Sequence, residues 1–219
     1  MTEPLDMTLD ELREALAPLI SRHAVFDGWT VKALDAAAGE IGVPADRARL
    51  CFPDGPVQMI DAWFDSIDVA MAMAFPPERI ATMKIRERIA GLVMFRIEAV
   101  DRDKEALRRA IAILAMPQNA LSAARLGWRA ADRMWRLAGD TATDFNHYSK
   151  RIILSGVYAS TTMIYLGDDS EGLAETRAFL DRRIGDVMRF EKAKADWRKG
   201  NEHMPSLSRF LGRLRYPVA

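Results

Sequence analysis

Residues 26–55 read FDGWTVKALDAAAGEIGVPADRARLCFPDG, and the turn signals in this stretch decide the fold class. Asp27-Gly28 ends a preceding helix, because glycine readily takes the left-handed conformation that closes a helix. Gly42 then turns the chain, and Pro44 suits the first position of a third short helix that stops at residues 53–55. The stretch therefore predicts short helices joined by a glycine turn, the arrangement of a helix-turn-helix.

The rest of the chain continues the helical pattern. Apolar residues recur at spacings of three and four, and no alternating run flanked by hairpin turns indicates a strand. Thr8-Leu9-Asp10-Glu11 is a capping box that begins the first helix. The sequence predicts an all-α fold with helices at about 8–23, 30–40, 44–53, 56–74, 78–100, 103–115, 119–139, 143–166 and from 169 or 170 onward.

Composition and length indicate a globular protein with a buried core. The chain has 219 residues, of which 49% are hydrophobic and 28% charged, as in a globular protein with a buried core. Its single cysteine, Cys51, cannot form an intrachain disulfide and reads as a small buried hydrophobe. The acidic N-terminus lacks the pattern of a secretory or transit peptide, so we expect a bacterial cytoplasmic protein. The longest uncharged run, 152–167, is too short to span a bilayer.

Charge is distributed unevenly along the chain. Residues 1–70 hold 13 acidic and 5 basic side chains, whereas residues 182–219 hold 10 basic and 4 acidic ones. The expected recognition helix offers only Arg47 and Arg49 beside Asp46. Because DNA binding requires several cationic contacts to phosphates, we expect a three-helix scaffold that does not bind nucleic acid.

Residue patterns for catalysis are absent from the sequence. It contains three histidines far apart and no HExxH, CxxC or glycine-rich phosphate loop. The nearest approach to a metal-ligand pair is Asp144-x-x-His147, which lacks the further ligands that a bundle metal site needs. We therefore predict no catalytic residue, no metal site and no cofactor.

Two helices raise the question of an internal cavity. In the helix from Asn119, an apolar face is expected at Leu121, Ala124, Trp128, Ala131 and Trp135, opposite a solvated or anion-binding stripe of Arg125, Arg129, Arg133 and Arg136. The middle of the next helix is apolar all round, which predicts that it is buried. The helix after Ser170 is expected to turn Leu173, Leu180, Ile184, Val187 and Met188 inward. The pattern leaves open whether side chains or a ligand fill the bundle.

The last segment is a short basic amphipathic helix by its pattern, with Ser206 as a possible cap. Such a helix can lie in a membrane interface, or it can fold back onto its own domain or a dimer partner, and the pattern leaves both open. The membrane-binding interpretation rests on Leu207, Arg209, Phe210, Leu211, Arg213, Leu214 and Arg215.

Two stretches carry a family resemblance. Residues 26–55 resemble the N-terminal domain of TetR-type regulators, and residues 138–151, AGDTATDFNHYSKR, resemble the signature of the Coq-nine family of ubiquinone biosynthesis. Supporting matches span residues 26–190: Phe26, Trp29 to Val31, Met116-Pro117-x-Asn119, Met134-Trp135, Tyr158, Phe179-Leu180, Arg183, Asp186 and Met188.

The resemblance implies a TetR-like helical bundle that is a homodimer, binds no DNA and catalyses no reaction. It implies domains at 1–55 (degenerate helix-turn-helix), 56–196 (lipid-binding) and 197–219 (linker and amphipathic helix). A hydrophobic pocket for an isoprenoid lipid or quinone is expected at Leu92, Phe95, Ile111, Leu114, Met116, Leu121, Trp128, Trp135, Leu154, Tyr158 and Met163. A patch that docks the di-iron hydroxylase of demethoxyubiquinone falls on Asp132, Met134, His147, Tyr148 and Arg151, with His147 where animal members usually have tryptophan.

The resulting hypothesis is an accessory protein, peripheral on the inner membrane, that lifts the ring of a quinone precursor toward a docked enzyme. A TetR-type ligand-responsive transcriptional regulator is the alternative. A catalytic quinone-modifying enzyme would need a cofactor for which the sequence has no motif.

Overall fold

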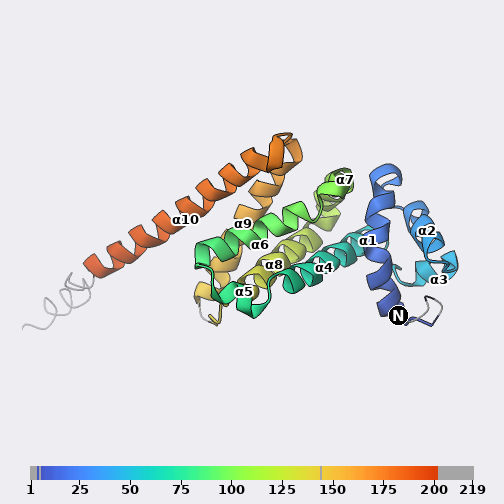
Figure 1. Ribbon diagram of the computed structural model, residues 1–219, viewed down its shortest axis with the longest axis horizontal. Coiled ribbons are helices and arrows are strands. Elements are labelled where there is room, and N and C mark those ends of the chain that lie inside the picture. The colour runs from blue at the N-terminus through green and yellow to red at the C-terminus, as the bar shows by residue number, and fades with distance from the viewer. Residues whose placement is uncertain (1–3, 5, 144, 202–219) are drawn as a thin grey trace, which may run out of the picture. The chain divides into compact units, whose positions relative to one another are not determined.

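Helices form all the regular structure of the residues described here (Figure 1). The computed structural model describes residue 4, residues 6–143 and residues 145–201, with backbone alone at 145 and 191–201. Within these ranges lie ten α-helices, three short 3-10 turns and no strand, which confirms the all-α prediction. The chain divides into two compact units, Met1–Leu180 and Asp181–Ala219, which are described separately.

The helices follow the predicted order. They are α1 (Leu9–Asp27), α2 (Val31–Glu40), α3 (Ala45–Leu50), α4 (Pro56–Ala74), α5 (Pro77–Ala81), α6 (Ile85–Glu98), α7 (Lys104–Leu114), α8 (Ala120–Leu137), α9 (Phe145–Gly167) and α10 (Ala174–Asn201). The 3-10 turns lie at Asp101–Asp103, Pro117–Asn119 and Glu171–Leu173. None of these helices combines the length and the apolar character that a membrane span requires.

The three N-terminal helices pack together through the apolar side of α1. The predicted capping box is present, with the Thr8 N–H donating to the Glu11 carboxylate at 2.8 Å. Gly28 and Gly42 have φ angles of 69° and 70°, as their predicted turns require. The buried Trp29 ties this region to α7, because its indole N–H donates to the Ala106 carbonyl oxygen at 2.9 Å.

The prediction of one helix over 78–100 is wrong. The chain breaks between α5 and α6, where the Thr82 hydroxyl donates to the Arg79 carbonyl oxygen at 2.9 Å. A new helix then begins, because the Glu87 carboxylate accepts the Lys84 N–H at 2.8 Å and satisfies an otherwise unpaired donor.

The predicted core face of α8 is also wrong, except at Ala131, which is fully buried. Its buried residues are Leu126, Ala130, Ala131 and Met134, whereas Leu121 and Ala124 are exposed and Trp128 and Trp135 are half-buried. Arg129 does not face solvent as part of an arginine stripe, since it pairs with Asp61 of α4 at 2.6 Å. The ion pairs of Arg129 with Asp61 and Asp65 join this side of α8 to α4.

Helix α9 is not buried all round, contrary to the prediction from its apolar middle. Leu154, Val157 and Tyr165 are buried, but the opposite side exposes Tyr148, Ile152, Met163 and Ile164. The exposed side therefore presents apolar side chains to the solvent in this single chain.

The start of α10 is organised by a residue that the sequence analysis passed over. The Asp168 carboxylate accepts the N–H groups of Ser170 and Thr176, each at 2.8 Å, while the expected cap Asp169 is exposed. Hydrogen bonds from Ser170 and Thr176 hold the pKa of Asp168 below its ordinary range.

The second unit contains the rest of α10, which remains helical to Asn201. Of its expected inward residues, Ile184 is buried but Met188 is exposed, so that part of the prediction is wrong. The predicted amphipathic helix, with its membrane residues between Leu207 and Arg215, lies outside the described residues.

Candidate functional site: the junction of α8 and α9

Helix α8 ends in a turn that only glycine suits well. Gly139 has a φ of 91°, and its N–H donates to the Arg136 carbonyl oxygen at 3.0 Å. The next N–H, of Asp140, donates to the Trp135 carbonyl oxygen at 2.9 Å. These two bonds are the pattern of a Schellman motif, which satisfies the last carbonyls of the helix. The turn places the Asp140 carboxylate against the first turns of α9.

A buried arginine joins the two helices. The Arg151 Nε donates to Asp132 Oδ1 of α8 at 2.6 Å, and its guanidinium also donates to Asp140 Oδ2 at 3.0 Å. Lys150 donates to the other Asp140 oxygen at 2.6 Å. The side chain of Arg151 is only 2% exposed, and that of Asp140 is 5% exposed. We call Asp132, Asp140, Lys150 and Arg151 the junction cluster.

The electrostatics of the junction cluster keep Asp140 ionised. Burial raises the pKa of the Asp140 carboxyl, but hydrogen bonds from Lys150 and Arg151 and the charge of Lys150 together outweigh it. The pKa of Asp140 therefore lies below its ordinary value of 3.8.

Above the junction cluster lies a group of aromatic side chains. The ring of Tyr148 is 5.1 Å from that of His147 and 6.0 Å from that of Trp128. Tyr148 is 57% exposed, and Ile152, one turn further along α9, is 64% exposed. We call Trp128, His147, Tyr148 and Ile152 the junction patch. A partly exposed aromatic and aliphatic surface of this kind is typical of protein interfaces.

The residues predicted to bind lipid are distributed between the interior and the surface. Leu92 and Leu154 are buried, and Phe95, Ile111, Leu114, Trp128, Trp135 and Tyr158 are half-buried. Met116, Leu121 and Met163 are exposed. These three lie on outward faces of their segments, so they do not line the interior of this chain.

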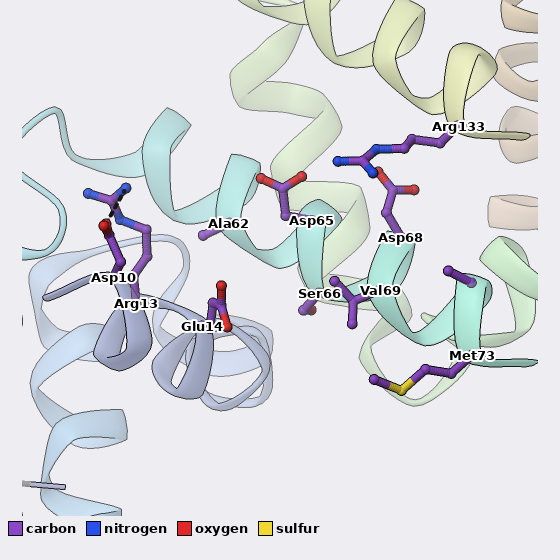
Figure 2. A pocket seen from close by; sticks show the side chains of 11 residues that line it. Asp10, Arg13, Glu14, Ala62, Asp65, Ser66, Asp68, Val69, Met73 and Arg133 are labelled. Carbon is purple, nitrogen blue, oxygen red and sulfur yellow. Dashed lines mark ion pairs between the residues drawn. The ribbon is translucent and has the colours of Figure 1, made fainter. Parts of the chain in front are cut away.

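The structure also contains a cleft that the sequence analysis did not anticipate. A hollow of about 980 Å³ opens between α1, α4 and α8 (Figure 2). None of the residues predicted to bind lipid lines it; its walls are formed by Asp10, Arg13, Glu14, Ala62, Asp65, Ser66, Asp68, Val69, Ala72, Met73 and Arg133. The signal in the sequence is the spacing of Asp61, Asp65 and Asp68, which places three carboxylates along one side of an apolar helix.

Comparison with known proteins finds similarity to one family. The sequence model of the COQ9 family matches residues 120–191, which contain α8, α9 and the whole junction. Over these residues the chain is similar to the COQ9 family. The mitochondrial ubiquinone biosynthesis protein COQ9 of Rattus norvegicus is 29% identical over 168 residues, and that of Homo sapiens is 27% identical. These matches cover 74% of this chain and 54% and 52% of those proteins, so the chain spans about half the length of the curated relatives it matches.

A solved structure supports the fold of this chain. A TetR transcriptional regulator from Nitrosomonas europaea superposes with a TM-score of 0.64 and 24% identity, covering 80% of this chain and 97% of the regulator. This similarity confirms the predicted TetR-like fold.

The COQ9 signature at 138–151 thus has a physical explanation. Two of the residues predicted to dock a partner, Met134 and Arg151, are buried, and Asp132 is largely covered. They position α8 against α9, whereas His147 and especially Tyr148 are accessible at the surface. His147 Nδ1 lies 3.0 Å from the Ala142 carbonyl oxygen, which fixes the ring at the edge of the junction patch.

The basic residues of the expected recognition helix are engaged by neighbouring residues of the N-terminal region. Arg49 pairs with Asp35 at 2.7 Å and with Asp46 at 3.4 Å, and Arg47 donates to the Met7 carbonyl oxygen. Cys51 is buried, and burial raises the pKa of its thiol. The described residues include no group of three or more His, Cys, Asp or Glu side chains suited to a metal ion, and Asp144 lies outside them.

Replacing Asp140 tests the junction cluster. Asp140→Asn should lower the free energy of unfolding by about 3 kcal/mol at neutral pH, because it removes one carboxylate from a buried cation. The folded-state pKa of Asp140 is lowered, so its stabilisation is complete only well above the ordinary value of 3.8 and is lost as pH falls through the folded-state pKa. Urea unfolding at pH 7 and near pH 3 should show the gap between variant and native chain closing in acid. Asp169→Asn, on a fully exposed carboxylate, is the matched control and should change little; an equal loss in both variants would contradict the role of the junction cluster.

Proposed function

We propose that this protein is a non-catalytic accessory protein of ubiquinone biosynthesis that binds polyprenyl quinone intermediates and presents them to a hydroxylase. One observation carries the proposal: the family match over 120–191 coincides with a junction whose buried charges hold an exposed aromatic patch in place. Such a patch is suited to binding another protein, and the cluster beneath it has no role in chemistry.

Lipid binding is supported by the composition of the helical bundle. Apolar side chains of α6 and α9, among them Leu92 and Leu154, turn toward the interior. Tyr158 belongs to the same interior and lies against the Arg96 guanidinium, with 5.2 Å from the guanidinium carbon to the ring centre. Cavities between helices of bundles are frequent ligand sites, and a polyprenyl tail needs such an apolar lining.

Membrane association is supported by the sequence of the last residues. A quinone precursor keeps its polyprenyl tail in the bilayer, so a protein that handles it must reach the membrane surface. The apolar stripe and three arginines within residues 207–215 suit binding in the headgroup region, with each arginine contributing about 1 kcal/mol near anionic lipid. We place the protein on the cytoplasmic face of a bacterial inner membrane.

Partner binding is assigned to the junction patch rather than to the buried residues beneath it. A large aromatic ring beside an aliphatic side chain, both exposed, is the composition of an interface hot spot. The proposed partner is the di-iron hydroxylase of demethoxyubiquinone. We also propose a homodimer, which light scattering of the purified full chain would detect as a doubled mass.

A TetR-type regulator is less well supported as the function. DNA binding would require free cations on the N-terminal helices, yet Arg49 is already paired with two carboxylates. A mobility shift with upstream DNA at low salt separates the two functions, because a regulator would bind and an accessory protein would not.

Extraction of bound lipid tests the central proposal. Organic extracts of the purified full chain should contain a polyprenyl-tailed ring compound, enriched well above its proportion in the host membrane. Mass spectrometry identifies it, and an unrelated protein purified from the same cells is the control. An extract with only bulk phospholipid would contradict lipid binding.

Liposome flotation tests the membrane interpretation. Phe210→Glu with Leu211→Glu should greatly reduce flotation with vesicles of phosphatidylethanolamine and phosphatidylglycerol, because each change removes roughly 2 kcal/mol of apolar burial. Ser206→Glu with Ser208→Glu adds the same charge outside the apolar stripe and should retain most of the binding. Equal flotation of both variants would mean that the stripe does not insert.

Co-purification tests the junction patch. Tyr148→Ala with Ile152→Ala should lower the amount of captured hydroxylase about tenfold or more, as expected when two hot-spot side chains are truncated. Met163→Ala, also exposed on α9 but well away from the junction patch, is the control. Undiminished capture by the double variant, with the same capture by the control, would remove the junction patch from the interface.

A further inference from the structure

The cleft between α1, α4 and α8 has the size of a small-molecule site. Its volume of about 980 Å³ lies at the upper end of the usual range for ligand pockets. One wall is apolar and accessible, because Val69 and Met73 of α4 are 55% and 77% exposed. The other groups at its surface are mostly charged, and Figure 2 shows that they come from three helices.

The floor of the cleft contains the Asp68 carboxylate, one oxygen of which accepts no hydrogen bond. The Asp68 side chain is only 3% exposed, and its Oδ1 accepts from the equally buried Arg96 of α6. Its other oxygen, Oδ2, is buried and has no hydrogen-bond partner among the described residues. Buried acceptors in folded proteins are almost always satisfied. A donor that enters the cleft, which Asp68 lines, would satisfy this oxygen.

Near Asp68 lies a cation that the described structure leaves without an ion pair or hydrogen bond, Arg133 of α8. Figure 2 shows its guanidinium extending over α4 toward Asp65 and Asp68. Asp65 pairs with Arg129 at 3.3 Å and Arg13 lies 3.8 Å from Asp10, whereas the exposed Glu14 of α1 has no ion pair or hydrogen bond among the described residues. A positively charged ligand at Asp68 would meet repulsion from Arg133, whereas a neutral ligand with a donor and an adjacent acceptor would satisfy both.

We propose that this cleft binds a neutral phenolic ring that carries a second oxygen next to its hydroxyl group. The phenol O–H donates to Asp68 Oδ2, the adjacent methoxy or carbonyl oxygen accepts from Arg133, and the ring and its alkyl chain pack against Val69 and Met73. Arg96 holds the carboxylate in place through its other oxygen. The inference rests on the proposed function, because it assigns to this cleft the ring of a quinone precursor whose tail the bundle encloses.

Titration calorimetry of the full chain tests the assignment with three probes that share one hexyl chain: a 2-methoxyphenol, its methyl ether and hexylammonium. The phenol should bind about tenfold more tightly than the ether, since it alone donates to a buried carboxylate. Hexylammonium should bind more weakly than the phenol. Equal affinities for phenol and ether, or tighter binding of hexylammonium, would overturn the proposal.

Two variants test whether Asp68 causes the preference for the phenol over its methyl ether. Asp68→Asn retains an oxygen for Arg96 but offers the ligand an N–H₂ group, so the preference for phenol over ether should disappear. Asp65→Asn, on the same cleft but half exposed, should retain the preference. The preference is a ratio of two affinities and does not depend on the folded fraction. A preference that survives Asp68→Asn would place the ligand elsewhere.

If Asp68→Asn fails to fold, Arg133→Met tests the same site from the exposed side. In the native chain the methoxy group should strengthen binding over an alkylphenol that lacks it, and in the Arg133→Met variant this gain should vanish; a gain that persists contradicts the proposal. Failure of these tests, with an isoprenoid still present in lipid extracts, would reject the cleft and leave the proposed function standing. An extract without isoprenoid, with phenol selectivity intact, would reject the function and leave the cleft.

Discussion

A buried guanidinium must be surrounded by carboxylates and carbonyl groups, and in this protein that constraint fixes how α8 meets α9. The Arg151 guanidinium donates hydrogen bonds to Asp132, to Asp140 and to the His147 carbonyl oxygen. Two carboxylates come from different sides of the interhelical turn, so the turn geometry and the helix packing are determined together. Removing one partner would leave a charge in a dry interface, which costs far more than an exposed ion pair contributes.

The sequence was sufficient for the order and the approximate bounds of most helices, because caps, glycines and prolines are local signals. Pro56 and Ala74, for example, bound α4 as predicted. It was insufficient wherever the outcome depended on a distant partner. Arg129 of α8 pairs with a carboxylate of α4, and side-chain hydrogen bonds mark the break before α6; periodicity registers neither.

In the candidate site, too, local signals were readable from the sequence and distant partners were not. The family resemblance of residues 138–151 was recognisable from their residue types. Residue types alone do not show which of these side chains are buried. The family resemblance placed Arg151 at an interface, whereas its two carboxylate partners hold it in the interior. Tyr148, three residues earlier, is the accessible one. The spacing of the carboxylates on α4 marks one wall of the cleft at Asp68, but the cleft itself is formed by helices whose side chains approach only after folding.

Two adjacent residues of α8, Asp132 and Arg133, point toward different neighbouring helices. Asp132 binds the guanidinium on α9, while Arg133 extends over the hollow beside α4. A helix behaves as a nearly rigid rod, so a small rotation of α8 moves both side chains at once. Only a partner whose binding rotated α8 would also alter the affinity of the hollow, and a molecule in the hollow would then alter the affinity of that partner by the same factor, as thermodynamic reciprocity requires.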